Sequence, residues 1–356
     1  MKILHTADWH LGAPLTGHTP QATQFLRAQL MAVPEKIVKL CTDEKCDLMI
    51  IAGDLFDGDV GRDTVVNVKQ VLGNLQIPVV ITPGNHDFCA ANSPYLQESW
   101  PENVHIFTRA QMDRLDLPEL DCTIYGAGYE AMDCPALMKQ FQAQGDARWH
   151  IGVLHGEVTS ANSVYCPITK QQIQQSALDY LALGHIHKQG SVSAGETVAI
   201  WPGCPMGRGF DELGDKGVII AEFGDGIRPM FVPLDTPRFF DETIDVAEDA
   251  AAALRTAVPA TQSDDFYRIS FTGYSADIDT DMLLQEFAHL KNLQLQDKTM
   301  PQADLWANAD DDTLEGLVLS ILKESADSDN AILAQRATLA AGICRRILDG
   351  QEVLLP

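Results

Sequence analysis

Short apolar runs alternate with longer amphipathic stretches along the first 82 residues of the chain. Each apolar run has the length of a strand, and the stretches between them show helical spacing, interrupted near Pro34. Strands separated by helices in this order indicate a mostly parallel sheet, buried between helix layers. The predicted strands are residues 2–7, 47–52 and 78–82, and the predicted helices are residues 21–46 and 63–75.

The pattern continues along the chain and changes in character near residue 235. A chain of 356 residues is long for one hydrophobic core. We therefore expect one domain over residues 1–235 and a smaller α/β domain over residues 236–356. Strands are predicted at residues 104–107, 123–127, 151–154 and 180–183, and antiparallel strands with Gly-rich turns at 197–201, 217–223 and 229–233. In the last part we predict helices at residues 248–257, 280–290, 313–325 and 330–348, and strands at 267–272 and 293–296.

Net charge sets a first limit on function. The chain carries 50 Asp and Glu against 25 Lys and Arg, a formal net charge of −25. Such a chain repels phosphate at long range, which disfavours unaided tight binding of nucleic acid. Solubility alone explains an acidic surface, but any polyanionic substrate then needs bound cations, a local basic patch or a partner subunit.

The cysteines and the chain start indicate a cytoplasmic location. Eight cysteines are scattered without a C-x-x-C pair, which favours free thiols over disulfides or a thiolate metal site. The longest apolar runs are of strand length, and the N-terminus turns polar too early for a signal peptide. We expect neither a membrane span nor an export signal.

Polar side chains suited to metal binding follow five of the predicted strands directly. The run ending at Ile81 stops at Pro83-Gly84, so its next side chains lie at the carboxyl edge of the sheet, where open α/β sheets bind ligands. Any one of these motifs could be a cap, a turn or a hydrogen-bonded histidine, but five together favour a shared site. The candidates are Asp8, His10, Asp54, Asn85, His86, His155, His185 and His187.

Carboxylate, imidazole and amide oxygen form a ligand set that suits Mn²⁺, Fe²⁺ or Zn²⁺ better than Ca²⁺ or Cu⁺. With His86 reserved for the substrate, seven ligands exceed what one tetrahedral ion needs. Two ions that share Asp54 would each have four protein ligands, and paired ions about 3.5–4 Å apart can activate water and clamp a phosphoryl group. The remaining histidines are expected to be ordinary core or surface residues: His5, His18, His105, His150 and His289.

These motifs resemble the calcineurin-like metallophosphoesterase superfamily, whose pattern is D-x-H, G-D, G-N-H-D/E, a distal H and G-H-x-H. Within it, the chain is most similar to the bacterial DNA-repair exonucleases of the SbcD and YhaO type. The resemblance implies a β-sandwich flanked by helices, with a smaller C-terminal α/β capping domain. It is carried by residues 3–12, 52–57, 84–87 and 182–187, and supported by Pro202-Gly203, Phe210-Asp-Glu212 and Lys216-Gly217.

The resemblance also implies a role for each residue of the site. His86 would protonate the leaving oxygen or stabilise the charged transition state. Asp57 would hold His86 in one tautomer, although it could instead be a turn carboxylate. Two divalent ions are implied, with Mn²⁺ favoured over Fe²⁺ or Zn²⁺. One ion would lie among Asp8, His10, Asp54 and His187, and the other among Asp54, Asn85, His155 and His185.

Three functions remain open on these grounds. The leading hypothesis is a two-metal phosphodiester hydrolase acting on DNA, an exonuclease or endonuclease subunit of an SbcCD-like repair complex. The alternative is a small-molecule phosphodiesterase acting on nucleotides or cyclic nucleotides, which the acidic composition and the few basic residues near the site favour. The third is a non-catalytic adaptor, but an adaptor has no physical need for seven intact ligands.

The resemblance further implies an SMC-like ATPase partner resembling SbcC or YhaN, and a homodimer is compatible with it. The predicted helix at residues 330–348 could dock this partner or pack on its own domain, because an apolar stripe alone fits both. Four residues are candidates for phosphate contacts, each more simply explained as a solvated surface residue: His18, Arg62, Arg208 and Lys216.

Overall fold

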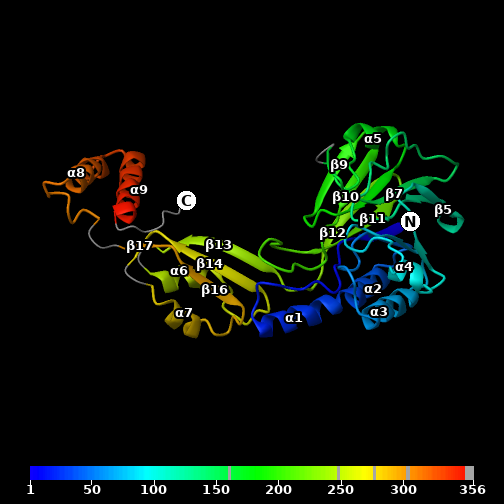
Figure 1. Cartoon of the computed structure of the whole chain (residues 1–356), viewed down its shortest axis with the longest axis horizontal. Helices are drawn as coiled ribbons and strands as arrows, with labels where there is room; N and C mark the ends of the chain where they lie inside the picture. The colour runs from blue at the N-terminus through cyan, green and yellow to red at the C-terminus, as the bar shows by residue number, and fades with distance from the viewer. Residues whose placement is uncertain (159–161, 247–248, 276–277, 302–304, 349–356) are drawn as a thin grey trace. The chain divides into compact units, whose positions relative to one another are not determined.

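The computed structural model describes residues 1–158, 162–246, 249–275, 278–301 and 305–348 (Figure 1). The chain divides into two compact units, Met1–Phe240 (unit 1) and Asp241–Pro356 (unit 2). The boundary expected at residue 235 falls between strands β12 and β13, whereas the units divide after Phe240. No helix among the described residues is both long and apolar enough to cross a lipid bilayer.

The first sheet of unit 1 has the strand order β12-β11-β1-β2-β3-β4. Strands β1 to β4 are parallel to one another, as the alternation of strands and helices predicts, and β11 is antiparallel to β1. Because parallel strands end at the same edge, the residues that follow β1, β2 and β3 come together. The strands are β1 (Lys2–Thr6), β2 (Leu48–Ala52), β3 (Val79–Thr82), β4 (Val104–Ile106), β11 (Gly217–Phe223) and β12 (Ile227–Pro233).

The second sheet of unit 1 has the order β5-β6-β7-β8-β10-β9. The expectation that residues 197–201 form an antiparallel strand is half wrong, because this strand is parallel to β8 and antiparallel only to β9. Two edge strands, β5 and β9, were not predicted; their alternate residues are exposed, so neither forms an apolar run. The strands are β5 (Asp113–Leu117), β6 (Cys122–Gly126), β7 (Trp149–His155), β8 (Tyr180–Gly184), β9 (Gly190–Ala194) and β10 (Thr197–Trp201).

A single apolar core joins the two sheets face to face. Ile3 and Ile50 of the first sheet belong to the same buried cluster as Ile124 and Val153 of the second. Burying one such side chain stabilises the fold by about 1.5–3 kcal/mol. The second sheet buries its other face under a separate cluster that includes Ile173 of helix α5. Unit 1 is therefore a β-sandwich with flanking helices, which confirms the predicted fold class.

The predicted helical stretch at residues 21–46 is interrupted, as expected, but at Ala32 rather than at Pro34 itself. Pro34 lies in the first turn of the second helix, where its missing N–H costs no hydrogen bond. The first helix begins at the cap Thr19, whose side chain accepts from the Ala22 amide. The helices of unit 1 are α1 (Pro20–Met31), α2 (Val33–Asp43), α3 (Arg62–Gly73), α4 (Pro94–Gln97), η1 (Pro118–Leu120) and α5 (Lys170–Gln175).

Unit 2 contains a three-stranded sheet of order β13-β14-β16, with β14 parallel to β16. The helix predicted at residues 280–290 ends earlier, at Glu286, and β13 was not predicted because its apolar and polar residues do not alternate regularly. The elements are β13 (Phe239–Asp245), α6 (Ala250–Ala257), β14 (Phe266–Thr272), β15 (Tyr274–Ser275), α7 (Thr280–Glu286), β16 (Leu293–Asp297), β17 (Met300–Pro301), α8 (Leu314–Ala326) and α9 (Ala331–Leu348).

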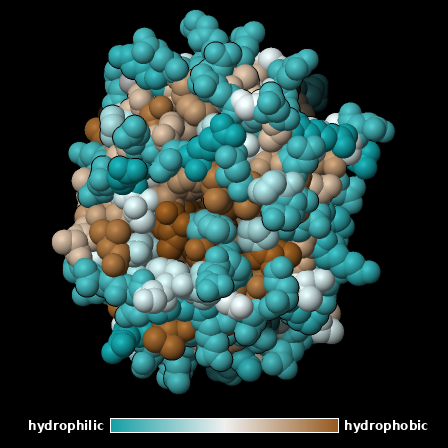
Figure 2. All heavy atoms as spheres, turned by 90° about the vertical axis from the view of Figure 1, so that its right-hand side faces the viewer, coloured by the Kyte–Doolittle hydropathy of each residue, from teal (hydrophilic) through white to brown (hydrophobic). Residues whose placement is uncertain are grey.

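The face of the molecule shown in Figure 2 is mostly hydrophilic, with hydrophobic residues in small groups between charged and polar ones. This distribution agrees with the strongly acidic composition of the chain.

Candidate metal centre

Five strand ends deliver the seven predicted ligands to one place. The loop after β1 is tied to the loop after β2, because the Asp8 amide donates to Gly53 O at 3.0 Å and the His10 amide donates to Asp54 O at 2.9 Å. The second sheet joins them through the His185 amide, which donates to the Asp8 carboxylate at 3.0 Å. Backbone hydrogen bonds therefore fix the loops before any metal is considered.

The backbone is strained at four of the predicted ligands. A non-glycine residue in the left-handed region costs of order 1–3 kcal/mol and persists only where the surrounding structure holds it. Such strain is typical of functional sites, where the fold places side chains that local preference would direct elsewhere. The residues and their φ angles are Asp8 (56°), His10 (48°), Asp54 (48°) and His185 (92°).

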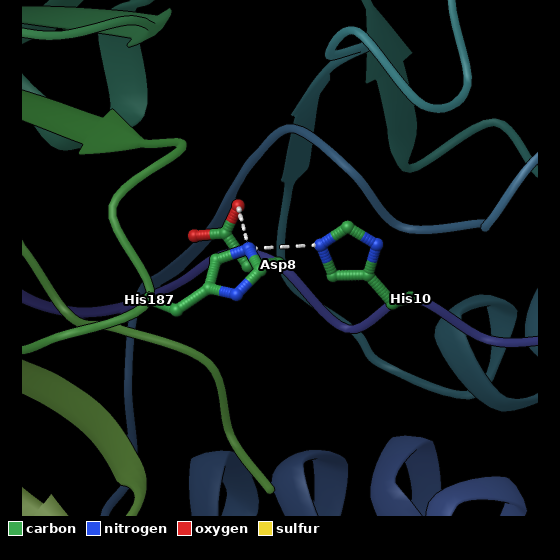
Figure 3. Close-up of side chains that lie close together, drawn as sticks. All are labelled: Asp8, His10 and His187. Atoms are coloured by element: carbon green, nitrogen blue, oxygen red, sulfur yellow. Dashed lines mark hydrogen bonds and ion pairs between the residues drawn. The ribbon is translucent and has the colours of Figure 1, made fainter. Parts of the chain in front are cut away.

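The first group of ligands consists of Asp8, His10 and His187 (Figure 3). His187 Nε2 lies 3.1 Å from His10 Nε2 and 3.9 Å from Asp8 Oδ1. His187 Nδ1 lies 2.6 Å from Glu212 Oε1, so this nitrogen carries the proton and Nε2 presents a lone pair. Burial lowers the pKa of His10, which favours the neutral form that binds metals.

The second group consists of Asp54, Asn85, His155 and His185. His155 Nδ1 donates to Ala52 O at 2.9 Å, because a carbonyl oxygen can only accept. Its Nε2 therefore presents a lone pair to two other acceptors, Asn85 Oδ1 at 3.0 Å and Asp54 Oδ2 at 3.3 Å. His185 Nδ1 lies 3.2 Å from the same Asn85 oxygen.

Acceptors that face one another in a buried site require a cation between them or an added proton. Burial lowers the pKa of His155, but the Asp54 and Asp8 carboxylates outweigh it and raise this pKa to about 10. A divalent ion would satisfy the same acceptors without that proton, and nitrogen and oxygen donors without sulfur suit such an ion. The donor set therefore fits a pair of metal ions that share Asp54.

His86 lies beside this centre with one nitrogen occupied. Its Nδ1 donates to Asp57 Oδ1 at 2.6 Å, and 46% of its side chain is exposed. The Asp57 carboxylate raises the pKa of His86, and the imidazoles of His10 and His86 hold the pKa of Asp57 well below its usual range. His86 also lies near His10 and Asp54. An exposed imidazole that holds its proton and adjoins a metal centre can donate that proton to a substrate.

Two residues of the 84–87 motif support the centre in ways that were not predicted, because their types are common in turns. Asp87 is buried, and its carboxylate accepts from the backbone amides of Leu55, Phe56 and Gly84, at 2.8, 3.1 and 2.7 Å. It thus fixes the loop after β2 against the loop after β3. A Cβ atom at Gly84 would lie 2.2 Å from Asp54 Oδ1, so only glycine fits there.

Two of the four candidates for phosphate contacts are not solvated surface residues. Only 20% of the Arg208 side chain is exposed, and Lys216 is buried with its Nζ 3.4 Å from His187 O. In contrast, 83% of the Arg62 side chain is exposed. His18 is partly buried, with Nε2 2.8 Å from Arg208 O. Sequence spacing could not reveal these positions, because all four residues lie in loops or at a helix start.

Within the described ranges, the remaining histidines and the cysteines form no further group that could hold a metal. His5 is fully buried with Nδ1 2.9 Å from the Tyr180 hydroxyl, and burial lowers its pKa to about 3. His150 and His289 contact polar groups of their own units. All eight cysteines are free thiols, as predicted.

The comparison with protein families identifies the family of the chain. The sequence profile described as calcineurin-like phosphoesterase matches residues 1–189, which include all seven predicted ligands together with His86 and Asp57. The chain belongs to the calcineurin-like phosphoesterase family. Members of this family are metal-dependent phosphoesterases, and the Asp and His cluster described above is the candidate metal site of this chain.

One curated protein and two solved structures illustrate what the chain is similar to. The uncharacterized metallophosphoesterase YhaO of Bacillus subtilis (strain 168) is 32% identical over 243 residues, which cover 64% of this chain and 58% of that protein. The match therefore spans less than two thirds of the relative's length. A dimetal phosphatase from Danio rerio has a TM-score of 0.45 at 12% identity and covers 66% of this chain and 97% of that one. An archaeal phosphodiesterase has a TM-score of 0.38 at 16% identity, with coverage of 65% and 100%.

Proposed function

We propose that the chain hydrolyses phosphodiesters with two divalent ions, most favourably Mn²⁺, with Fe²⁺ or Zn²⁺ as alternatives. The observation that carries this proposal is the close approach of His155 Nε2 to the oxygens of Asn85 and Asp54, at 3.0 and 3.3 Å, in a buried site. One ion would lie among Asp8, His10, Asp54 and His187, and the other among Asp54, Asn85, His155 and His185. When bound, the ions would supply an activated water and neutralise phosphoryl charge.

The side chains around the ions would complete the reaction. His86 would deliver its Nε2 proton to the leaving oxygen, since its Nδ1 is held by Asp57 at 2.6 Å. Asp57 would keep the imidazole in this tautomer and in its protonated form. Asp8 would orient the loop of His185, because its carboxylate accepts from the His185 amide.

DNA is the substrate that we propose, with the chain as the nuclease subunit of an SbcCD-like repair complex. The amino-acid sequences of the metal-binding motifs support this substrate, because they resemble those of the exonucleases of the SbcD and YhaO type. The ions would neutralise phosphate that a chain of net charge −25 otherwise repels, and a partner would contribute the remaining affinity for DNA.

The proposed partner is an SMC-like ATPase that binds the last helices of unit 2. Helices α8 and α9 bury Leu319 and Ala341 against each other, but leave large apolar side chains exposed. This supports docking over packing on the same domain, because the described part of unit 2 does not cover these side chains. They include Leu314, Leu317, Ile321, Ile332, Leu333, Leu339, Ile347 and Leu348. Deletion after Ser328 should abolish ATPase association in a pull-down, and unchanged association would exclude this surface.

A small-molecule phosphodiesterase acting on nucleotides or cyclic nucleotides is the second candidate. It is favoured by the acidic composition and by the small number of basic side chains near the site, where Arg208 and Lys216 contact His187. Such a substrate needs no long basic groove.

One assay separates the two candidates. The purified chain with Mn²⁺ is offered labelled single- and double-stranded DNA, bis(p-nitrophenyl) phosphate and 2′,3′-cyclic nucleotides, with and without the ATPase. We expect hydrolysis of the chromogenic diester and of DNA, with the DNA rate rising when the ATPase is present. Turnover of small esters alone, even with the ATPase, would remove the nuclease proposal, and no turnover with any metal would remove the hydrolase proposal.

A further inference from the structure

The carboxylate of Glu212 binds two side chains at the edge of the metal centre. Its Oε1 lies 2.6 Å from His187 Nδ1 and 2.8 Å from Arg208 Nη2. Its Oε2 accepts from the Arg208 backbone amide at 2.8 Å and from Arg208 Nε at 3.3 Å. Only 6% of the Glu212 side chain is exposed, so these bonds form in a partly desolvated site. Glu212 and Arg208 lie beyond residue 189, where the family match ends, whereas His187 lies within it.

For His187, the contact with Glu212 decides which nitrogen faces the metals. The carboxylate requires a proton on Nδ1, so Nε2 is left bare and directed at His10 and Asp8. Carboxylates that hold a ligating histidine in this way typically strengthen metal binding by about 10–100-fold.

For Arg208, the same contact fixes the guanidinium in one orientation. Nε and Nη2 donate to the two oxygens of Glu212, whereas Nη1 has no hydrogen-bond partner among the described residues. A guanidinium used only as a structural ion pair would not need to leave a donor free next to a reaction centre. Because 20% of the side chain is exposed, solvent or a bound anion can reach it.

The guanidinium lies beside one of the candidate metal ligands. Arg208 Nη2 is 3.1 Å from His187 Nδ1. The His187 ring lies 4.8 Å from the His10 ring, and the His10 ring lies 4.7 Å from the His86 ring, measured between centroids. A phosphoryl group held between the metals and His86 would therefore lie near Arg208.

We propose that Arg208 Nη1 binds a non-bridging oxygen of the substrate phosphoryl group, and that Glu212 is the positioning residue that holds both Arg208 and His187. This inference rests on the proposed phosphodiester hydrolysis. Arginine suits the task because its planar fork can hold a carboxylate with two donors while another donor binds phosphate. In a chain of net charge −25, this side chain brings a fixed positive charge to the substrate.

Inorganic phosphate and bis(p-nitrophenyl) phosphate test the role of Arg208 in the full-length chain loaded with Mn²⁺. Arg208→Gln should lower kcat/KM by about 10–100-fold and weaken inhibition by phosphate by a similar factor, since a charge-assisted hydrogen bond is lost. Both Mn²⁺ ions should stay bound by elemental analysis, and low concentrations of guanidinium chloride should restore part of the activity. Arg109→Gln, at an exposed arginine of unit 1, is the matched control and should leave both constants unchanged.

Glu212→Gln tests the positioning role separately. The amide oxygen still accepts from His187, but it no longer holds Arg208 with a charge. We expect metal affinity, measured by calorimetry, to fall by about 10-fold and phosphate inhibition to weaken as in Arg208→Gln. Arg208→Lys keeps the charge and the ion pair, and it provides a folded variant should Arg208→Gln prove unstable. Its kcat/KM and its inhibition by phosphate should fall less than those of Arg208→Gln, because lysine lacks only the planar fork of donors.

The outcomes distinguish this inference from the function on which it rests. Unchanged kcat/KM and unchanged phosphate inhibition in both Arg208 variants would overturn the inference while leaving the hydrolase proposal intact. A wild-type chain that hydrolyses no phosphodiester would overturn the proposed function. Phosphate binding to the Mn²⁺-loaded wild type and Arg208→Gln, measured by calorimetry, would then still show whether Arg208 binds the anion, and equal affinities would exclude it.

Discussion

The two units of the chain use their apolar residues in different ways. Unit 1 buries them between two six-stranded sheets and leaves strained polar residues at the strand ends. Unit 2 has a three-stranded main sheet and a pair of helices whose mutual core is small. Among the described residues, ten of the sixteen exposed large hydrophobic side chains lie in unit 2, although it is the shorter unit.

This difference agrees with the proposed division of roles, in which unit 1 carries the hydrolysis and unit 2 binds the partner. A rigid core can hold left-handed ligand residues, because the free energy of packing outweighs the local strain. Exposed apolar helix faces add nothing to the stability of the folded chain and gain free energy only when another surface covers them. We therefore expect substitutions in unit 1 to affect turnover and metal binding, and substitutions on the helices of unit 2 to affect partner binding.

The largest expected effect is that of His86→Ala in unit 1. Loss of the proton donor should lower kcat on bis(p-nitrophenyl) phosphate by about 10²–10⁴-fold. Both metal ions should remain, because His86 Nδ1 is bound to Asp57 rather than to the ligand set. His289→Ala in unit 2 is the matched control and should leave kcat unchanged. Loss of the metals in His86→Ala would contradict the role given to His86.

A pair of leucines on helix α8 compares a buried with an exposed apolar residue in unit 2. Leu319 is fully buried, and Leu319→Ala should destabilise the helix pair by about 2–5 kcal/mol. Leu317 is 59% exposed, and Leu317→Ala should change stability by no more than about 0.5 kcal/mol. Denaturant unfolding measures both. A large loss in Leu317→Ala would show that this face is covered within the chain.

Gly84→Ala tests how tightly unit 1 holds its ligands. The added Cβ would lie 2.2 Å from Asp54 Oδ1 and 2.8 Å from His155 Nε2, so it must displace one of them. We expect a loss of stability of about 1–3 kcal/mol together with weaker Mn²⁺ binding in calorimetry. Gly316→Ala in unit 2, where the Cβ would lie 2.1 Å from Asp311 O, should cost stability and leave Mn²⁺ binding intact.

The smallest expected effect is a change in pH dependence. Asp57 raises the pKa of His86, so the protonated imidazole persists to higher pH and activity falls only as pH rises through that raised pKa. Asp57→Asn removes the carboxylate, so the loss of activity with rising pH should begin at a lower pH than in the wild type. The profile of kcat/KM against pH measures this, and a displacement of one pH unit changes the rate about 10-fold on the alkaline side. If the alkaline limb of this profile lies at the same pH in Asp57→Asn as in the wild type, a group other than His86 controls the loss of activity.

Much of the candidate site could be predicted because the sequence carries it locally. Apolar runs that end in Asp8, Asp54 and Asn85 specify both the strands and the residues after them. In a parallel sheet such ends meet at one edge, so spacing along the chain becomes proximity in space. The edge strands β5 and β9 could not be predicted in this way, because their exposed side chains leave no apolar run.

The sequence by itself determined which residues could bind metal and which apolar runs would be strands, since both depend on residue type and short-range order. Only the tertiary structure decided the role of groups that lie far apart in the chain. Asp87 connects the loops after β2 and β3, and Glu212 connects Arg208 to His187. No local sequence pattern predicts these contacts. The apolar residues of α8 and α9 show the same limit. Helical spacing identifies an apolar stripe on each helix, but whether that stripe is buried depends on which other parts of the fold pack against it.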